Sequence, residues 1–303
     1  MKQGIWAAFG AYALWGLLPI YWKLLQHVPP SLILCHRILW SFVFLFILLK
    51  FTGHLRPFPK LSPKVWCIYI VSSLIIGLNW FLYIWSVSAG FIVETSLGYF
   101  INPLFSVLLG LFFLGERLRK VQWLALVLAF CGVLYMTILM GRLPWVALTL
   151  AFTFSLYGLA KKKAPLGSTP GLALETAFLL PLALGLIGWN EISNTQSFFD
   201  SGTTTILLLA GAGVVTSLPL LLFAKAAHRI PLYMIGFLQY ISPTTQFLLG
   251  VFVYHEAFGK DQLIGFSLVW ASVLIFCLEG LFNIRKQRHV TAALSKAQPE
   301  GRD

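Results

Sequence analysis

Apolar stretches long enough to cross a lipid bilayer recur from one end of this 303-residue chain to the other. Inside a bilayer every backbone polar group must be satisfied within the protein, so runs of about 20 apolar residues fold as helices. Charged residues make up only 11% of the chain, whereas soluble domains carry about 25%. The sequence therefore predicts an all-α membrane protein.

We predict ten membrane-spanning helices, most of them separated by turns that contain proline or polar residues. The predicted spans are residues 4–22, 32–51, 66–88, 92–114, 121–139, 144–160, 171–189, 204–226, 231–253 and 262–282. The remaining segment, 283–303, is predicted to be a disordered, basic, cytoplasmic tail.

The positions of lysine and arginine predict the orientation. If the N-terminus is cytoplasmic, 18 of the 22 Lys and Arg residues lie in cytoplasmic segments, three lie outside and Arg37 lies within a span. Cytoplasmic loops of membrane proteins carry an excess of Lys and Arg, so both ends of the chain are predicted to be cytoplasmic. The net charge of +12 is therefore attributed to topology and the lipid bilayer, and no nucleic-acid partner is expected.

An internal repeat relates the two halves of the chain at an offset of 140 residues. Residues 97–120 read LGYFINPLFSVLLGLFFLGERLRK, and residues 237–260 read FLQYISPTTQFLLGVFVYHEAFGK. Each copy would hold five spans, and because five is odd the second copy would enter the membrane from the opposite side. We therefore predict two inverted five-helix repeats, residues 1–140 and 141–282, as in many secondary transporters.

The repeat aligns two prolines that fall inside predicted spans, Pro103 and Pro243. A proline inside a helix frees a carbonyl and usually kinks the helix. Matching interruptions in the two halves of a transporter point to its binding site. The alternative is a packing kink that contacts no ligand.

Five runs of residues carry a resemblance to a known family: CHRILWS (35–41), GLNWFLYIW (77–85), SLGYFINP (96–103), LQYISPT (238–244) and QFLLG (246–250). They resemble the RarD group, in the EamA branch of the drug/metabolite transporter superfamily. The resemblance implies ten helices, cytoplasmic chain ends, a bacterial inner membrane and transport of a small organic solute.

Ionisable residues inside membrane spans are costly and usually functional. Arg37 lies roughly 9 Å in from the predicted outer face, and Glu94 begins a span near the same face. Glu175 lies at a similar depth from the inner face, where Lys225 ends a span. We hypothesise that the pairs Arg37–Glu94 and Glu175–Lys225 stabilise the outer and inner closed states. The alternative is that each pair only neutralises charge during assembly.

Proton coupling is a further hypothesis. His36, with an ordinary pKa of about 6.5, and the carboxylates of Glu94 and Glu175 could exchange protons with solvent. A structural ion pair would explain the two carboxylates equally well.

Amides and aromatic rings in the central spans are candidates for the lining of a solute cavity, because such a mixture suits an aromatic or amphipathic solute. Tryptophan and tyrosine are also common at membrane interfaces, so the aromatics are the weaker candidates. The stretch Ala210–Gly213 is interpreted as close helix packing and not as a phosphate-binding loop. The candidates are Asn79, Trp80, Tyr83, Tyr99, Asn102, Gln239 and Tyr240.

The sequence therefore favours a secondary transporter that works by alternating access. A membrane-embedded enzyme, or a channel or permease without ion coupling, is the alternative. No catalytic residue, metal ligand, cofactor or obligate protein partner is predicted, and His255-Glu256 lacks the second histidine of a zinc-protease motif.

Overall fold

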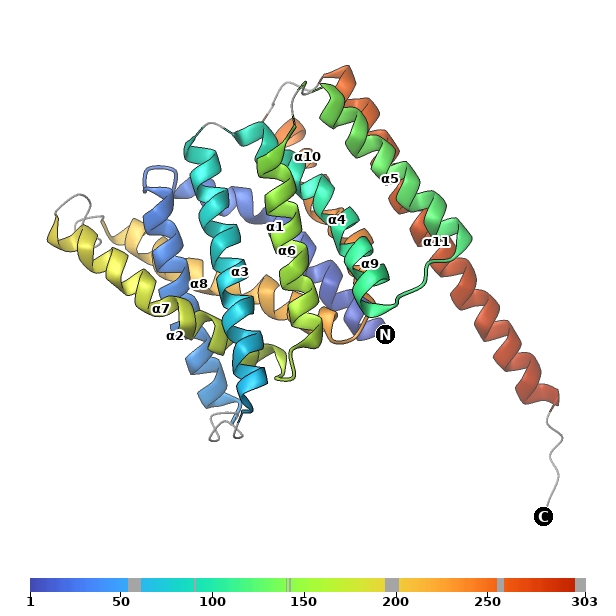
Figure 1. Cartoon of the computed structure of the whole chain (residues 1–303), viewed down its shortest axis with the longest axis horizontal. Coiled ribbons are helices and arrows are strands. Elements are labelled where there is room, and N and C mark those ends of the chain that lie inside the picture. The colour runs from blue at the N-terminus through green and yellow to red at the C-terminus, as the bar shows by residue number, and fades with distance from the viewer. Residues whose placement is uncertain are drawn as a thin grey trace, which may run out of the picture. The chain divides into compact units, whose positions relative to one another are not determined.

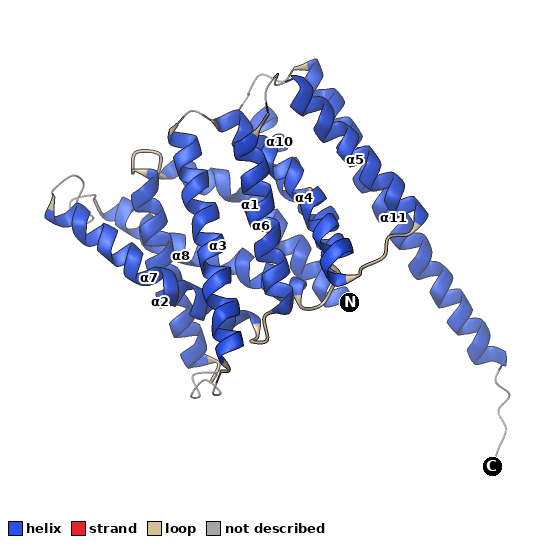
Figure 2. Ribbon diagram, viewed as in Figure 1, coloured by secondary structure: helices blue, strands red, loops and turns tan. Residues whose placement is uncertain are grey.

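The computed structural model describes residues 1–53, 61–89, 91–139, 141, 143–193, 202–254 and 259–297. In these residues all regular secondary structure is helical, which confirms the all-α prediction for them (Figures 1 and 2). The elements are α1 (Lys2–Leu24), α2 (Pro30–Phe51), α3 (Pro63–Ser88), α4 (Ile92–Leu114), α5 (Lys120–Leu139), α6 (Trp145–Lys163), α7 (Ser168–Ile192), α8 (Thr203–Ala227), α9 (Leu232–Gln239), α10 (Ile241–Leu248), the π-helix η1 (Leu249–Val253) and α11 (Lys260–Ala297).

Eight of the described helices are long and apolar enough to cross a membrane: α1 to α5, α7, α8 and α11. The predicted span 144–160 corresponds to α6, whose last turn holds three lysines. The predicted span 231–253 is divided among α9, α10 and η1. A helix is thus present at each of the ten predicted ranges, and eight of these helices meet the length and composition of a membrane span.

Proline and glycine mark several helix boundaries. Pro30 starts α2 and Pro63 starts α3, because a residue in the first turn has no intrahelical use for its N–H. Gly115 ends α4 with φ of 64°, in the left-handed conformation that glycine adopts at low cost.

The chain divides into two compact units: Met1–Glu116 with Arg142–Ala257, and Arg117–Gly141 with Phe258–Asp303. In the first unit α1 packs against α8, α2 against α7 and α8, and α3 against α6 and α7. Helix α4 packs against α6 and α9 in the same unit. In the second unit α5 packs against α11.

Helices α2 and α8 approach each other at Gly213. A side chain at this position would collide with the backbone of Trp40 and Ser41, and the Ser41 hydroxyl donates to the Gly213 carbonyl at 3.1 Å. The interpretation of 210–213 as close helix packing is confirmed.

The two matching prolines have different effects on their helices. Pro243 lies just after the break between α9 and α10, which falls at Tyr240. Pro103 lies inside α4, which runs without interruption. Each proline removes only one hydrogen bond from the helix ladder, so the bonds on either side can keep a helix continuous.

The second unit contains the end of the chain. The carboxylate of Glu279 on α11 receives a hydrogen bond from Arg119 at 2.7 Å and another from Gln122 at 3.1 Å. Helix α11 then continues to Ala297, so the prediction of a disordered tail is wrong for residues 283–297. Most residues of this segment are good helix formers and extend a helix that is already nucleated.

Candidate solute site

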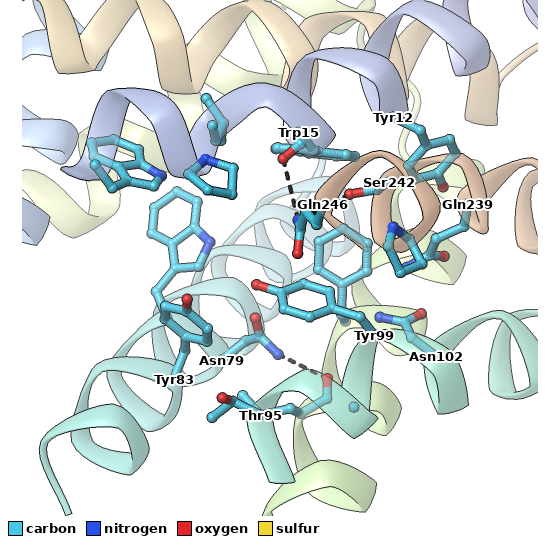
Figure 3. A pocket seen from close by; sticks show the side chains of 18 of the residues that line it. Tyr12, Trp15, Asn79, Tyr83, Thr95, Tyr99, Asn102, Gln239, Ser242 and Gln246 are labelled. Atoms are coloured by element: carbon cyan, nitrogen blue, oxygen red, sulfur yellow. Dashed lines mark hydrogen bonds between the residues drawn. The ribbon is translucent and has the colours of Figure 1, made fainter. Parts of the chain in front are cut away.

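A cavity of about 180 Å³ lies within the first compact unit. Side chains from α1, α2, α3, α4, α6, α8, α9 and α10 line it, so it lies where most helices of this unit converge (Figure 3). The structure brings together six of the predicted site residues along its wall: Arg37, Asn79, Tyr83, Asn102, Gln239 and Pro243. Trp80 and Tyr99 also line it, whereas Tyr240 does not belong to the lining.

Arg37 is the one Lys, Arg, Asp or Glu residue among the lining residues that the structure describes. Its guanidinium carbon lies 4.8 Å from the ring centroid of Trp22 and 5.1 Å from that of Trp80. Its Nε–H donates to the Thr216 hydroxyl at 3.0 Å. Two indole rings and one hydroxyl therefore hold a positive charge at the cavity wall.

Two asparagines of the wall are fixed by hydrogen bonds to α6. The Asn79 amide donates to the Leu150 carbonyl at 2.9 Å and to the Thr153 hydroxyl at 2.8 Å. The Asn102 side-chain oxygen accepts from Ser155 at 2.9 Å. A buried amide is costly without partners, and these bonds supply them.

Gln239 and Tyr12 have buried polar atoms at the cavity wall. The Gln239 side-chain oxygen and the Tyr12 hydroxyl have no hydrogen-bond partner among the described residues. Figure 3 shows both side chains near Ser242, on the opposite side of the view from Tyr83. Both atoms are buried, so a solute would reach them only if the surrounding side chains move.

The two prolines act on the backbone of the wall. Because proline lacks an N–H, Pro103 and Pro243 leave the carbonyls of Tyr99 and Gln239, four residues earlier, without their usual intrahelical donor. Tyr99 and Gln239 both line the cavity, and the two residues lie 140 positions apart in the sequence.

Five packed aromatic rings connect the cavity to a buried charged group. Their centroids lie between 5.5 and 6.4 Å apart, and we call them the aromatic cluster: Tyr12, Trp15, Phe154, Tyr157 and Phe223. Three of its members line the cavity. Tyr157 instead donates its hydroxyl to Glu175 at 3.1 Å.

Glu175 lies in a sealed polar group. Its carboxylate is 2.8 Å from the Lys161 ammonium, and both side chains are about 98% buried or more. Tyr157 and Ser72 also donate to this carboxylate. The predicted partner Lys225 is exposed, so the pairing of Glu175 with Lys225 is wrong. Lys161 and Tyr157 lie one turn apart on α6 and both contact Glu175 of α7.

The remaining predicted residues lie elsewhere. His36 is buried in α2 but does not line the cavity. Pro103 lies in α4, with its carbonyl against Gly236 of α9. Glu94 lies in α4 next to Thr95, but its side chain falls outside the described residues. The pairing of Arg37 with Glu94 therefore stays a prediction.

Sequence reasoning missed Trp22, Thr216 and Lys161. Trp22 is the last residue of the predicted span 4–22 and was indistinguishable from an interfacial tryptophan. Thr216 is one of two adjacent hydroxyl residues, with Ser217, in an apolar run, where threonine usually bonds its own helix. Lys161 is the first of three consecutive lysines, and this run was assigned to a cytoplasmic loop although it ends α6.

Comparison with known proteins gives consistent results. The model of the EamA-like transporter family matches residues 2–138. The uncharacterized transporter YojE of Bacillus subtilis is 46% identical over 91% of this chain and 93% of its own length. Protein RarD of Salmonella typhimurium is 43% identical over 94% and 98%, respectively. The chloramphenicol-sensitive protein RarD of Pseudomonas aeruginosa is 30% identical over 94% and 97%.

A solved structure has the same fold. It superposes with a TM-score of 0.70 and covers 90% of this chain and 96% of its own, at 20% sequence identity. This likeness concerns the helical architecture alone.

Proposed function

Because the chain belongs to the RarD group of the EamA-like transporter family, we propose that it is a secondary transporter that carries a small organic solute across the bacterial inner membrane. The cavity at Arg37, Asn79 and Gln239 is the solute site, and it carries this proposal. It combines aromatic rings with a few fixed polar groups, as solute sites do. Its position within a multi-pass membrane protein makes transport the function that it best supports.

The helix boundaries support two inverted five-helix repeats, residues 1–140 and 141–282, followed by the tail 283–303. Three pairs of helices start 140 residues apart: α3 and α8, α4 and α9, and α5 and α11. This is the offset at which the two sequence segments align. With five helices in each copy, the second copy has the opposite orientation in the membrane.

The packing within the first compact unit supports the same repeat. Helix α1 packs against α8, and its counterpart α6 packs against α3, the counterpart of α8. Helix α2 packs against α8, and α7 packs against α3. Helices α4 and α9, which are counterparts of each other, also pack together. An approximate two-fold axis between the halves would produce this pattern.

The mechanism that we propose is alternating access. In the conformation of this structure, the path from the cavity to the cytoplasmic side is the closed one. The aromatic cluster and the pair Lys161–Glu175 occupy the half of the unit that the positive-inside rule places toward the cytoplasm. The Glu116 carboxylate also binds the N-terminus of α9 on that side, by accepting from Leu232 at 2.7 Å and Tyr233 at 2.9 Å. Opening toward the cytoplasm would require these contacts to separate.

Proton exchange is the coupling that we propose, with His36, Glu94 and Glu175 as the groups available for it. If collapse of the proton gradient leaves transport unchanged, coupling through protons is wrong while uncoupled transport stands.

Metabolite profiling followed by reconstitution tests the function. A compound whose cellular level moves in opposite directions in deletion and overproducing strains nominates the solute. Proteoliposomes that contain the purified chain should then show saturable uptake and counterflow of that solute. Flux without counterflow would favour a channel, and a chemically altered compound would favour a membrane-embedded enzyme.

A further inference from the structure

We propose that the solute is an organic anion: a compact, flat apolar body that carries a carboxylate or similar group, which binds Arg37. This inference rests on the proposed function, because it assigns the chemistry of the same cavity. It is carried by the charge of the wall, the contacts of Arg37 and the size of the cavity.

The charge of the wall is positive. Arg37 is charged, and no aspartate or glutamate belongs to the lining that the structure describes. Within the described residues, no carboxylate lies within ion-pair distance of the guanidinium. A charge without a counter-ion is costly in a low-dielectric interior. An anionic solute would supply the counter-ion.

The contacts of Arg37 leave its binding edge available. The guanidinium has five N–H groups, and Nε–H is the one that bonds a protein acceptor in the described part of the chain. The two terminal nitrogens can form the paired hydrogen bonds by which arginine binds a carboxylate or phosphate. Stacking against Trp22 and Trp80 holds the guanidinium plane in place.

The same contacts disfavour a cationic solute. Aromatic cavities can bind cations through the faces of their rings. Here one face of each of the Trp22 and Trp80 rings is already occupied by the Arg37 guanidinium. A second cation would meet a like charge and would find no carboxylate among the lining residues that are described.

The size and the remaining polar atoms define the body of the solute. A cavity of about 180 Å³ is slightly larger than the roughly 150 Å³ cavity that holds benzene in an engineered protein. It therefore has room for one ring and a small charged group. Polar side chains of the lining, such as Tyr83 and Gln246, can bond one polar substituent on the ring.

Three one-ring probes of similar size and different charge test the inference by calorimetric titration of the full chain in detergent. They are benzoate (anionic), benzamide (neutral) and benzylamine (cationic). Benzoate should bind about tenfold or more tightly than benzamide, because hydrogen bonds between charged partners are the stronger ones. Benzylamine should bind most weakly. Equal affinity for benzoate and benzamide, preference for benzylamine, or no binding of any probe would overturn the inference.

Two variants of Arg37 and one control locate the preference. Arg37→Gln should remove the advantage of benzoate over benzamide. Arg37→Lys should keep part of this advantage, because the positive charge remains while the paired hydrogen bonds of the guanidinium are lost. Lys23→Gln removes an exposed charge that contacts Tyr254 outside the cavity and should leave the preference unchanged. A preference for benzoate that persists in Arg37→Gln with a native-like thermal transition would place the anion elsewhere and would also overturn the inference.

Glu94 provides the remaining test, because it is the acidic residue nearest in sequence to the lining residue Thr95. If benzoate is preferred only in Glu94→Gln, Glu94 is the native counter-ion of Arg37 and the inference is wrong.

If benzoate is preferred in the native chain but no solute is transported, the anion site stands and the proposed function fails. If the chain instead shows saturable counterflow of a neutral solute, and benzoate does not inhibit this counterflow, the proposed function stands and the anion site is wrong.

Discussion

The hydroxyl of Tyr240 donates a hydrogen bond to the carbonyl of Phe100 at 3.3 Å, and these two residues are 140 positions apart. They are therefore equivalent positions of the proposed repeat. Equivalent residues of a two-fold structure can touch only close to its axis. The bond thus places the proposed axis at the contact between α4 and α9, beside the cavity wall formed by Tyr99 and Gln239.

Tyr240→Phe tests the importance of this contact for transport. The change removes the hydroxyl and keeps the ring, so the free energy of unfolding should fall by only about 0.6 kcal/mol, a typical value for a hydrogen bond within a membrane protein. The rate of solute counterflow should nevertheless change at least about twofold, because the alternating access that we propose would move α4 and α9 relative to each other. Unfolding in detergent and proteoliposome flux measure the two quantities.

Tyr21→Phe is the matched control for that variant. Tyr21 also donates its hydroxyl to a backbone carbonyl, that of Leu208, but it belongs to α1 and lies away from the α4–α9 contact. It should show a similar small loss of stability and an unchanged counterflow rate. Equal effects of both variants on counterflow would argue against a special role for the contact.

Gly236→Ala should disrupt the packing of α4 against α9. A β-carbon at Gly236 would lie 2.7 Å from the Pro103 carbonyl oxygen, and a backbone atom cannot rotate away as a side chain can. Overpacking of this kind costs about 1–3 kcal/mol. We expect a lower thermal transition and a loss of most counterflow. Gly188→Ala, where nothing lies within 4 Å of the added carbon, should have no measurable effect, and equal tolerance of both changes would contradict the close contact.

The helical fold was accessible from the sequence because membrane-spanning length and apolar composition are local properties. The helices at the ten predicted ranges differ from the predictions only in their ends and in the division of the span 231–253. The polar members of the cavity wall were accessible for a related reason. Amides such as Asn79 and Asn102 are rare in apolar spans, and burial without partners would be too costly for them to be accidental.

The pairing of charged side chains on different helices could not be predicted from the sequence in the same way. Depth along a helix placed Glu175 and Lys225 at one level of the membrane, but it does not tell which face of a helix each side chain occupies. The partner of Glu175 is Lys161, on a helix whose end extends three residues beyond the predicted span 144–160. An error of one helical turn at a boundary was therefore enough to assign a buried lysine to a loop.

Glu116→Ala should weaken the proposed closure of the cytoplasmic side. The carboxylate accepts from the first two N–H groups of α9, and loss of such a cap costs about 0.5–2 kcal/mol. A cysteine placed at Leu150, which lines the cavity from α6, should then react faster with a thiol reagent added from the cytoplasmic side of inverted membrane vesicles. Glu116→Gln keeps one acceptor oxygen and should give an intermediate rate. Identical labelling of all three proteins would show that the cap does not hold the closed state.

The pair Lys161–Glu175 gives the sharpest test of the proposal that the cytoplasmic half is closed. Glu175→Gln or Lys161→Met alone leaves one buried charge unpaired. Such a change typically lowers the free energy of unfolding by about 3–5 kcal/mol. Each single variant should therefore reduce the amount of folded protein in detergent severely. The double variant Lys161→Met with Glu175→Leu removes both charges and should recover most of the folded protein, because buried ion pairs are often replaceable by apolar residues. Lys225→Gln, at the exposed lysine, should behave as the unmodified chain.

If the pair acts only in assembly, the double variant should also recover full counterflow of the solute. If it stabilises the closed cytoplasmic half, as we propose, the double variant should fold but transport abnormally. The missing attraction would let the aromatic cluster separate more easily, so thiol labelling of the cavity from the cytoplasmic side should increase. A folded double variant with native counterflow and native labelling would therefore contradict the proposed role of this pair while leaving the transporter assignment intact.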